Sequence, residues 1–316
     1  MNNQSPQPTA PTAVSPLKQG GARALPAPYQ PMSHAGPIDL RLDANEGQPI
    51  IELPALLASL DSGAMRRYPD SSRLRTALAA RWKVDTNRVL VTAGADDAID
   101  RACRAFLGPG REIIAPSPTF EMIPRYALVA GARVISPSWP GGAFPVDEVL
   151  AAVSASTAMI AVVSPNNPTG AVATAADLRL LAEGAPNATL LVDLAYAEFA
   201  GEDLTQAALA LPNAIVLRTF SKAFGLAGLR IGYAIADESN IRRLASVGAP
   251  YPVSSIGLAA AVESLDAAPA QLPPKIARVL EERAKLIEFL RDLGASPNPS
   301  RGNFVLCNFP NAEWVW

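Results

Sequence analysis

The 316-residue sequence has few of the residues that many catalytic and structural sites require. It contains one histidine, His34, and two cysteines, Cys103 and Cys307, which lie far apart in the chain. These shortages argue against histidine-dependent hydrolysis, histidine zinc sites and a disulfide framework, and we expect no metal site. Scarce, unpaired cysteine is typical of a reducing compartment, so we expect a cytoplasmic protein.

Charge and long apolar runs are also scarce. The formal net charge is −2, too small to create a field that recruits nucleic acid or an anionic membrane. No apolar run reaches the length of a membrane span, and the N-terminus lacks the layout of a signal peptide. What the sequence does contain is 49% apolar residues, which is enough for a large α/β core.

Composition and pattern divide the chain into three parts. Residues 1–37 carry eight prolines and no apolar period, which predicts a disordered tail. Residues 38–249 predict a large domain that begins with a short N-terminal arm. Residues 250–316 predict a smaller α+β domain.

The middle part alternates apolar runs with helical patterns. Strands are predicted over residues 89–92, 112–115, 132–136, 159–163, 190–192, 214–217 and 229–236. Helices are predicted over residues 72–82, 94–107, 119–130, 144–154 and 174–183. Apolar strands without polar alternation, separated by helices, are typical of a mostly parallel sheet covered on both faces. We therefore predict an α/β fold of three layers, with ligands at the carboxyl ends of the strands.

The last part predicts two helices and a strand. The helices span residues 256–265 and 273–293, with Pro273 and Pro274 in the first turn of the second, where a missing N–H is harmless. The strand spans residues 303–307.

Lys222 is the most unusual residue of the pattern, because it lies between two apolar runs. Burying an unpaired ammonium is costly. One reason to do so is chemistry, since a desolvated amine forms a Schiff base with a carbonyl cofactor. The alternative is a solvated lysine in a glycine-rich turn.

Other polar residues also follow the ends of predicted strands. A phosphate group on such a cofactor requires the amides of a helix N-terminus, a hydroxyl and an arginine. Gly94–Asp96, Ser221 and Arg230 supply them, and we expect the side chains of Asp96 and Asp97 to point away from the phosphate.

The ring of such a cofactor has further requirements. A protonated ring nitrogen requires a buried carboxylate, which Asp193 can provide. A ring oxygen requires neutral donors, and Asn167 and Tyr196 are the candidates. Phe120 is a candidate to cover the ring, although an ordinary core position explains it equally well.

Several segments resemble the class I/II pyridoxal-phosphate aminotransferases of fold type I. They are Ser-Pro-Asn-Asn-Pro-Thr-Gly at 164–170, Asp193 to Phe199, and Arg218 to Tyr233. Within that family the chain is most similar to the histidinol-phosphate aminotransferase group, whose motifs resemble Asp-Ala-Asn-Glu at 43–46 and Arg-Tyr-Pro-Asp at 67–70.

The resemblance implies a role for each matching residue. Lys222 would be the catalytic residue, attached to pyridoxal 5'-phosphate and moving the proton during the reaction. Asn45 and Glu46 would contact the substrate. The other cofactor-binding residues would be Ala95, Asp96, Phe120, Asn167, Asp193, Tyr196, Ser221 and Arg230, with Tyr68 reaching the phosphate from the partner subunit of a homodimer.

Two departures from the family pattern are visible. Leu194 stands where the family has glutamate, a change that spares the implied cofactor contacts. The family also continues well beyond the segment that resembles 302–306 and carries an arginine for the substrate's anionic group. No counterpart precedes Trp316, so we expect an incomplete small domain and weaker substrate recognition.

The resemblance implies a transaminase that uses a small amino donor and a 2-oxo acid acceptor. Histidinol phosphate and 2-oxoglutarate, a pair from histidine biosynthesis, are the leading substrates. One alternative is a threonine-phosphate decarboxylase with the same cofactor. Another is a truncated chain that binds the cofactor without catalysis.

Overall fold

The computed structural model describes residues 25–30 and 43–310, and the chain divides into two units, 1–43 and 44–316. Residues 25–30 have no regular secondary structure. The predicted disordered tail and the start of the predicted arm lie largely outside the described residues. The paragraphs below concern the second unit.

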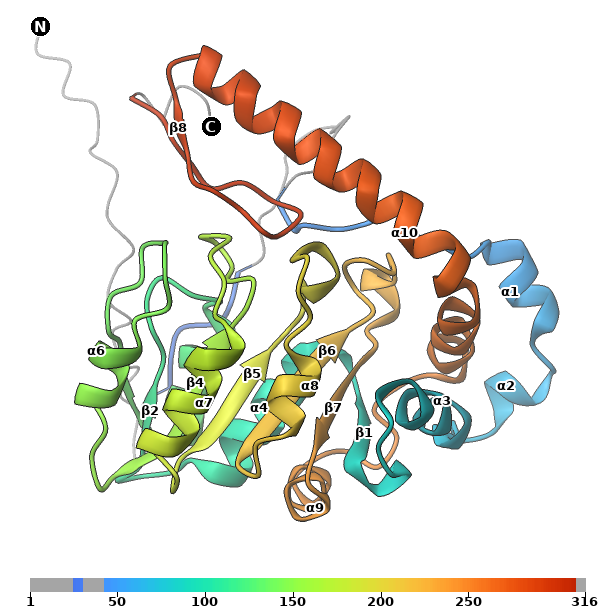
Figure 1. Cartoon of the computed structure of the whole chain (residues 1–316). Coiled ribbons are helices and arrows are strands. Elements are labelled where there is room, and N and C mark those ends of the chain that lie inside the picture. Colours follow the sequence, from blue (N-terminus) through green and yellow to red (C-terminus); the bar gives the residue numbers. More distant parts are fainter. Residues whose placement is uncertain (1–24, 31–42, 311–316) are drawn as a thin grey trace, which may run out of the picture. The chain divides into compact units, whose positions relative to one another are not determined.

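A seven-stranded sheet runs through this unit in the order β1-β7-β6-β5-β4-β2-β3 (Figure 1). Its strands are β1 (Val89–Thr92), β2 (Glu112–Ile114), β3 (Arg133–Ile135), β4 (Thr157–Val163), β5 (Thr189–Asp193), β6 (Ala214–Thr219) and β7 (Gly232–Ala236). Every neighbouring pair from β6 to β3 is parallel, and β7 runs antiparallel to β6 and β1. The prediction of a mostly parallel sheet is confirmed.

Helices cover both faces of the sheet. The α-helices of the described residues are α1 (Leu53–Ser59), α2 (Gly63–Arg66), α3 (Ser72–Trp82), α4 (Gly94–Phe106), α5 (Met122–Ala130), α6 (Val146–Ala151), α7 (Ala175–Gly184), α8 (Thr205–Leu209), α9 (Glu238–Ser246) and α10 (Ser255–Asp292). The sequence analysis did not predict α8 or α9.

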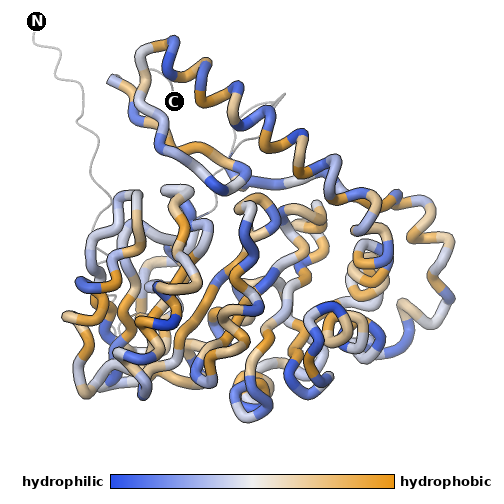
Figure 2. The backbone as a smooth tube through the Cα atoms, viewed as in Figure 1, coloured by the Kyte–Doolittle hydropathy of each residue, from blue (hydrophilic) through white to orange (hydrophobic). Residues whose placement is uncertain are grey.

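Alternation along the strands explains the three layers. Successive side chains of a strand point to opposite faces. In β4, Met159 and Ala161 pack with α4, α5 and α9, whereas Ile160 and Val162 belong to the core on the side of α3, α7 and α8. Figure 2 shows the hydrophobic colouring that these buried strands share. A strand buried on both faces has no polar alternation, which is why the sequence showed continuous apolar runs.

The sheet topology gathers the strand ends that matter for function. Because β1, β4, β5 and β6 point the same way, the segments that follow them leave from one edge of the sheet. Asp193 closes β5 and Thr219 closes β6 at this edge.

The prediction of two separate helices after residue 250 is wrong. One helix, α10, contains Pro269, Pro273 and Pro274 in its interior. Proline removes a backbone hydrogen bond and bends a helix, but it need not end the helix where tertiary packing supports both sides. Leu258 and Leu272, on either side of the first proline, are both buried, and Figure 1 shows α10 changing direction along its length.

Two predicted strand boundaries are also wrong. The strand predicted over 303–307 is reduced to β9 (Cys307–Asn308), which pairs with β8 (Ser296–Pro297), because the side chains of Asn303 and Phe304 contact other loops instead. The strand predicted from Leu229 begins only at Gly232, because Arg230 adopts a left-handed conformation with φ of 52°.

None of the helices that the structure describes is long and apolar enough to cross a membrane.

Candidate active site

Lys222 lies in the turn between β6 and β7, at the carboxyl edge of the sheet. Its Nζ donates a hydrogen bond to the carbonyl oxygen of Ala44 at 2.7 Å and lies 5.5 Å from the centre of the Tyr196 ring. Burial lowers the pKa of the Lys222 ammonium below its usual value, although the carboxylates of Asp96 and Glu46 oppose that shift. A larger fraction of the amine is therefore unprotonated and nucleophilic than in a solvated lysine.

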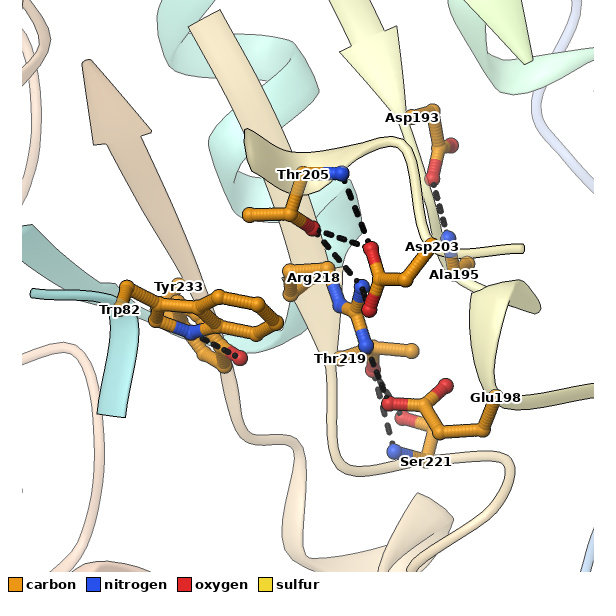
Figure 3. Close-up of polar contacts among 10 residues, drawn as sticks. All are labelled: Trp82, Asp193, Ala195, Glu198, Asp203, Thr205, Arg218, Thr219, Ser221 and Tyr233. Carbon is orange, nitrogen blue, oxygen red and sulfur yellow. Dashed lines mark hydrogen bonds and ion pairs between the residues drawn. The ribbon is translucent and has the colours of Figure 1, made fainter. Parts of the chain in front are cut away.

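Asp193 presents a carboxylate that is poorly compensated. Its side chain is 2% exposed, and its Oδ1 accepts a hydrogen bond from the backbone N–H of Ala195 at 3.0 Å (Figure 3). Burial raises the pKa of Asp193 to about 6, and the Ala195 N–H and the charge of Lys222 only partly oppose the shift. An added cation that donated a hydrogen bond to this oxygen pair would lower the cost of burying it.

Tyr196 is held as a neutral phenol beside Lys222. Its hydroxyl accepts a hydrogen bond from Nδ2 of Asn45 at 3.2 Å, and the side chain of Asn167 also bonds to it. Burial raises the pKa of Tyr196 to about 12, so the hydroxyl keeps its proton at neutral pH. The structure thus brings Asn167, Tyr196 and Lys222 together.

The N-terminus of α4 and Arg230 form a positively polarised pair. Arg230 lies so close to Gly94 that a Cβ added there would be 2.6 Å from the guanidinium. The first amides of a helix have no intrahelical partner and attract anions. Ser221 lies nearby in sequence on the Lys222 turn, 6% exposed, and its Oγ bonds to Oγ1 of Thr219 at 2.9 Å.

The two aspartates of this helix start behave differently from each other. Asp97 accepts a hydrogen bond from the N–H of Ala93 at 2.9 Å and pairs with Arg101. Asp96 instead faces the arginine of the helix start, with its Oδ2 2.9 Å from the Arg230 guanidinium. Two positive features facing one another attract the nearest carboxylate.

The donor set fits a phosphorylated carbonyl compound with a basic ring. An uncompensated buried carboxylate suits a ring N–H, a neutral phenol suits a ring oxygen, and a helix N-terminus with an arginine suits a phosphate. These groups surround an amine of lowered pKa.

Two predicted site residues lie outside this cluster of contacts. Tyr68 is 79% exposed and stacks on Tyr251 with ring centres 4.5 Å apart. Phe120 is half-buried and packs against the core on the side of α4 and α5. Within one chain, neither makes a described contact with Lys222, and their roles toward a cofactor remain predictions.

The sequence analysis missed residues that support the cluster from the end of the chain. Nδ2 of Asn303 donates to the carbonyl oxygen of Asn45 at 3.1 Å, and the ring of Phe304 meets that of Tyr196 edge-to-face at 4.9 Å. The available signal was Asn303, a polar residue directly before the apolar run 304–306. The sequence analysis interpreted it as the start of a strand.

Arg218, on β6, pairs with two carboxylates from the segment that follows β5 (Figure 3). Its side chain is 2% exposed and donates to Glu198 at 2.5 Å and to Asp203 at 2.7 Å. Burial lowers the pKa of the Arg218 guanidinium, but the two carboxylates outweigh that effect and raise it overall. The Trp82 ring lies 5.0 Å away, a cation–π contact that completes the enclosure.

A half-buried amine of lowered pKa, a buried carboxylate and an anion-binding helix start at one edge of a mostly parallel sheet define an enzyme class that works with a phosphorylated carbonyl cofactor. A family model described as aminotransferase class I and II matches residues 38–316. The chain is 35% identical over 304 residues to an aromatic amino acid aminotransferase of Streptomyces avermitilis, over 92% of this chain and 84% of that protein. It is 38% identical over 278 residues to a histidinol-phosphate aminotransferase of Roseiflexus castenholzii, over 85% and 74%.

A solved structure gives the same result. The histidinol-phosphate aminotransferase of Sinorhizobium meliloti in complex with pyridoxal-5'-phosphate matches with a TM-score of 0.76 and 26% identity, over 84% of this chain and 74% of that one. The chain belongs to the class I and II aminotransferases. The predicted family, the fold type I architecture and pyridoxal 5'-phosphate as the cofactor are confirmed.

We predict that Asp193→Asn makes the cofactor-free protein more stable than the wild type at pH 8. A raised pKa means that the folded wild type binds the proton more tightly, so its stability falls as the pH rises from about 4 through about 6. Two pKa units correspond to about 3 kcal/mol at most. Asparagine keeps the acceptor for Ala195 and cannot ionise. Melting temperatures at pH 8 and pH 5 check this; an equal difference at both pH values would contradict it.

We predict that Arg218→Met lowers the free energy of unfolding by about 3–5 kcal/mol, because the buried Glu198 carboxylate loses its partner. Urea unfolding measures the change. Arg242→Met is the matched control, since its pair with Glu238 is exposed at both ends and contributes at most about 1 kcal/mol. Similar losses in the two variants would show that the Arg218 pair is no anchor.

Proposed function

We propose that the chain is a transaminase that moves an amino group from histidinol phosphate to 2-oxoglutarate. The observation that carries the proposal is the convergence of the half-buried Lys222 amine and the buried Asp193 carboxylate at the edge of the sheet where α4 begins. Family membership supports the reaction type, and relatives named histidinol-phosphate aminotransferase support the substrate.

Pyridoxal 5'-phosphate supplies an aldehyde that condenses with amines and a ring that withdraws electrons from the adjacent carbon–hydrogen bond. Lys222 supplies the amine that holds the cofactor, and it then moves the proton that leaves the substrate carbon. Asp193 holds a proton on the ring nitrogen. Asn167 and the neutral Tyr196 hydroxyl bind the ring oxygen.

The remaining predicted residues have roles in binding the cofactor's phosphate, covering its ring and contacting the substrate. The amides of Ala95 and Asp96, the Ser221 hydroxyl and the Arg230 guanidinium would bind the phosphate, with Arg230 exchanging its Asp96 partner for that group. Phe120 covers one face of the ring. On the substrate side, Asn45 and Glu46 stand on a segment that already touches Tyr196 and Lys222.

An aromatic amino acid is the second candidate donor. It is favoured by the relatives at 35–37% identity that are named aromatic amino acid aminotransferases. Both candidates carry a planar ring beyond the amino-bearing carbon, so the two proposals share one requirement for a flat side-chain pocket.

Half-reaction spectra test the reaction and the donor together. We expect histidinol phosphate to convert the visible band of the attached cofactor to that of the amino form, and 2-oxoglutarate to restore it. Lys222→Ala should lose turnover and borohydride-stable cofactor labelling while keeping the melting behaviour of a folded protein. Mass mapping of the trapped protein should place the label on Lys222.

The same assay separates the alternatives. Faster conversion by phenylalanine or tyrosine would transfer the proposal to the aromatic donor. Release of carbon dioxide from threonine phosphate would indicate the decarboxylase. A labelled Lys222 that no amino donor converts would leave a cofactor-binding chain without catalysis, and a label elsewhere would refute the proposed site.

We also propose a cytoplasmic homodimer in which Tyr68 reaches the phosphate in the partner subunit. Tyr251 stacks on Tyr68, and both rings are exposed. The segment before Tyr68 also exposes Leu53, Leu57 and Met65, and exposed apolar side chains of this kind suit a second copy of the chain.

Mixing two inactive variants tests this arrangement. Lys222→Ala keeps Tyr68, and Tyr68→Ala keeps Lys222, so a mixed dimer contains one site with both residues intact. We expect the reassociated mixture to be more active than the sum of the separate samples. No gain on mixing, with dimers present in sedimentation, would mean that Tyr68 acts within its own chain or not at all.

A further inference from the structure

Lys275 of α10 is a half-buried ammonium that contacts two backbone carbonyls. Its Nζ donates to the carbonyl oxygen of Gln48 and, at 2.8 Å, to that of Ala223. Within the described part of the chain it forms no ion pair, and burial lowers its pKa to about 8. An ammonium is more stable in water or beside a carboxylate than half-buried against two carbonyls. The position of Lys275 is therefore unfavourable for the lysine itself, and its effect is to bind the two carbonyl oxygens.

The two carbonyls belong to the two segments that the proposed reaction has to align. Ala223 directly follows Lys222 in the turn between β6 and β7. Gln48 closes the segment that carries Asn45 and Glu46, the predicted substrate contacts. One side chain of α10 therefore bridges the reacting amine's turn and the substrate segment.

The backbones of these segments meet without side chains between them. A Cβ added to Gly47 would lie 2.3 Å from the carbonyl oxygen of Lys222, and one added to Gly225 would lie 2.1 Å from that of Gln48. Such an approach brings carbonyl dipoles together, and a shared ammonium donor compensates for their repulsion.

The substrate segment has little else to hold it. Residues 44–49 form no helix or strand, so no ladder of backbone bonds fixes them. Side chains hold the segment through Lys222 to Ala44, Asn303 to Asn45, Asn45 to Tyr196, and Lys275 to Gln48. The Lys222 amine is committed to chemistry in the proposed function, so Lys275 is the cation that can hold the segment throughout a turnover.

We propose that Lys275 is a positioning residue: its ammonium holds the substrate segment, residues 44–49, against the Lys222 turn. The clamp sets where the substrate contacts stand relative to the reacting amine. The inference rests on the proposed transaminase function, and its test includes a measurement that does not depend on that function.

Three variants test the clamp in the full-length protein. Lys275→Met removes the donor and keeps the aliphatic stem, and Lys275→Arg keeps a cationic donor. Lys285→Met is the matched control, because Lys285 lies on the same helix but pairs with Glu281 and Glu282 at the surface. Hydrogen exchange of the cofactor-free protein and steady-state kinetics of the loaded enzyme are measured for each.

We expect Lys275→Met to speed amide exchange in peptides covering 44–50 and 222–226, with the strands of the sheet unchanged. The KM for the amino donor should rise about tenfold, the effect of losing one charged hydrogen bond, while kcat changes less. Lys275→Arg should restore both measurements to within a few-fold of the wild type, and Lys285→Met should match the wild type.

Several results would overturn the clamp. If the amides of residues 44–50 exchange at the wild-type rate in Lys275→Met, the segment is held without the Lys275 ammonium. Faster exchange throughout the sheet, without rescue by arginine, would show a general structural role. If the wild type reacts with no amino donor, the proposed function fails, and the exchange measurement still decides whether Lys275 holds the segment.

Discussion

The ion pairs of Arg218 are the interaction on which the geometry of the site depends. A fully buried guanidinium is tolerated only when its charge is matched, and Glu198 and Asp203 match it from the segment that follows β5. Arg218 itself lies on β6, four residues before Lys222. The network therefore ties the loop after Asp193 and Tyr196 to the strand that leads into the reacting turn, so the amine and the carboxylate cannot drift apart.

Buried charges with a full set of partners and buried charges without one have different roles in this chain. The first kind stabilises the fold, and the second kind lies in the candidate active site. Arg218 is matched by two carboxylates, and its pKa rises. Arg101 is paired with the carboxylate of Asp97. Asp193 is buried and Lys222 half-buried, both with incomplete partners, and their pKa values move toward the neutral forms. A buried charge without a partner lowers the stability of the folded protein. A charged ligand that binds beside it supplies the missing partner and restores that stability, so such charges are typical of binding sites.

The fold and the cofactor side of the site could be predicted because they depend on local pattern and topology. Continuous apolar runs indicate strands buried on both faces, and a parallel sheet places their ends together whatever the loops do. Thr174, which caps α7 with Asp177 in a capping box, is an equally local signal. The course of α10 could not be read this way, because tertiary packing decides whether an internal proline ends a helix or bends it. Asn303, Phe304 and Lys275 were missed because their partners are more than 50 residues away in sequence.

The two sides of the site are therefore built by different means. The cofactor side consists of strand ends and a helix start, whose positions the sheet determines. The proposed substrate side consists of residues 44–49 and the loop at Asn303 and Phe304, which are held by single side-chain contacts. Sequence changes in such loops alter the pocket without disturbing the sheet. This division explains why relatives of similar identity share one family and still divide between aromatic amino acid and histidinol-phosphate names. Under the proposed function, specificity in this chain is then set by residues 44–49, which form no helix or strand.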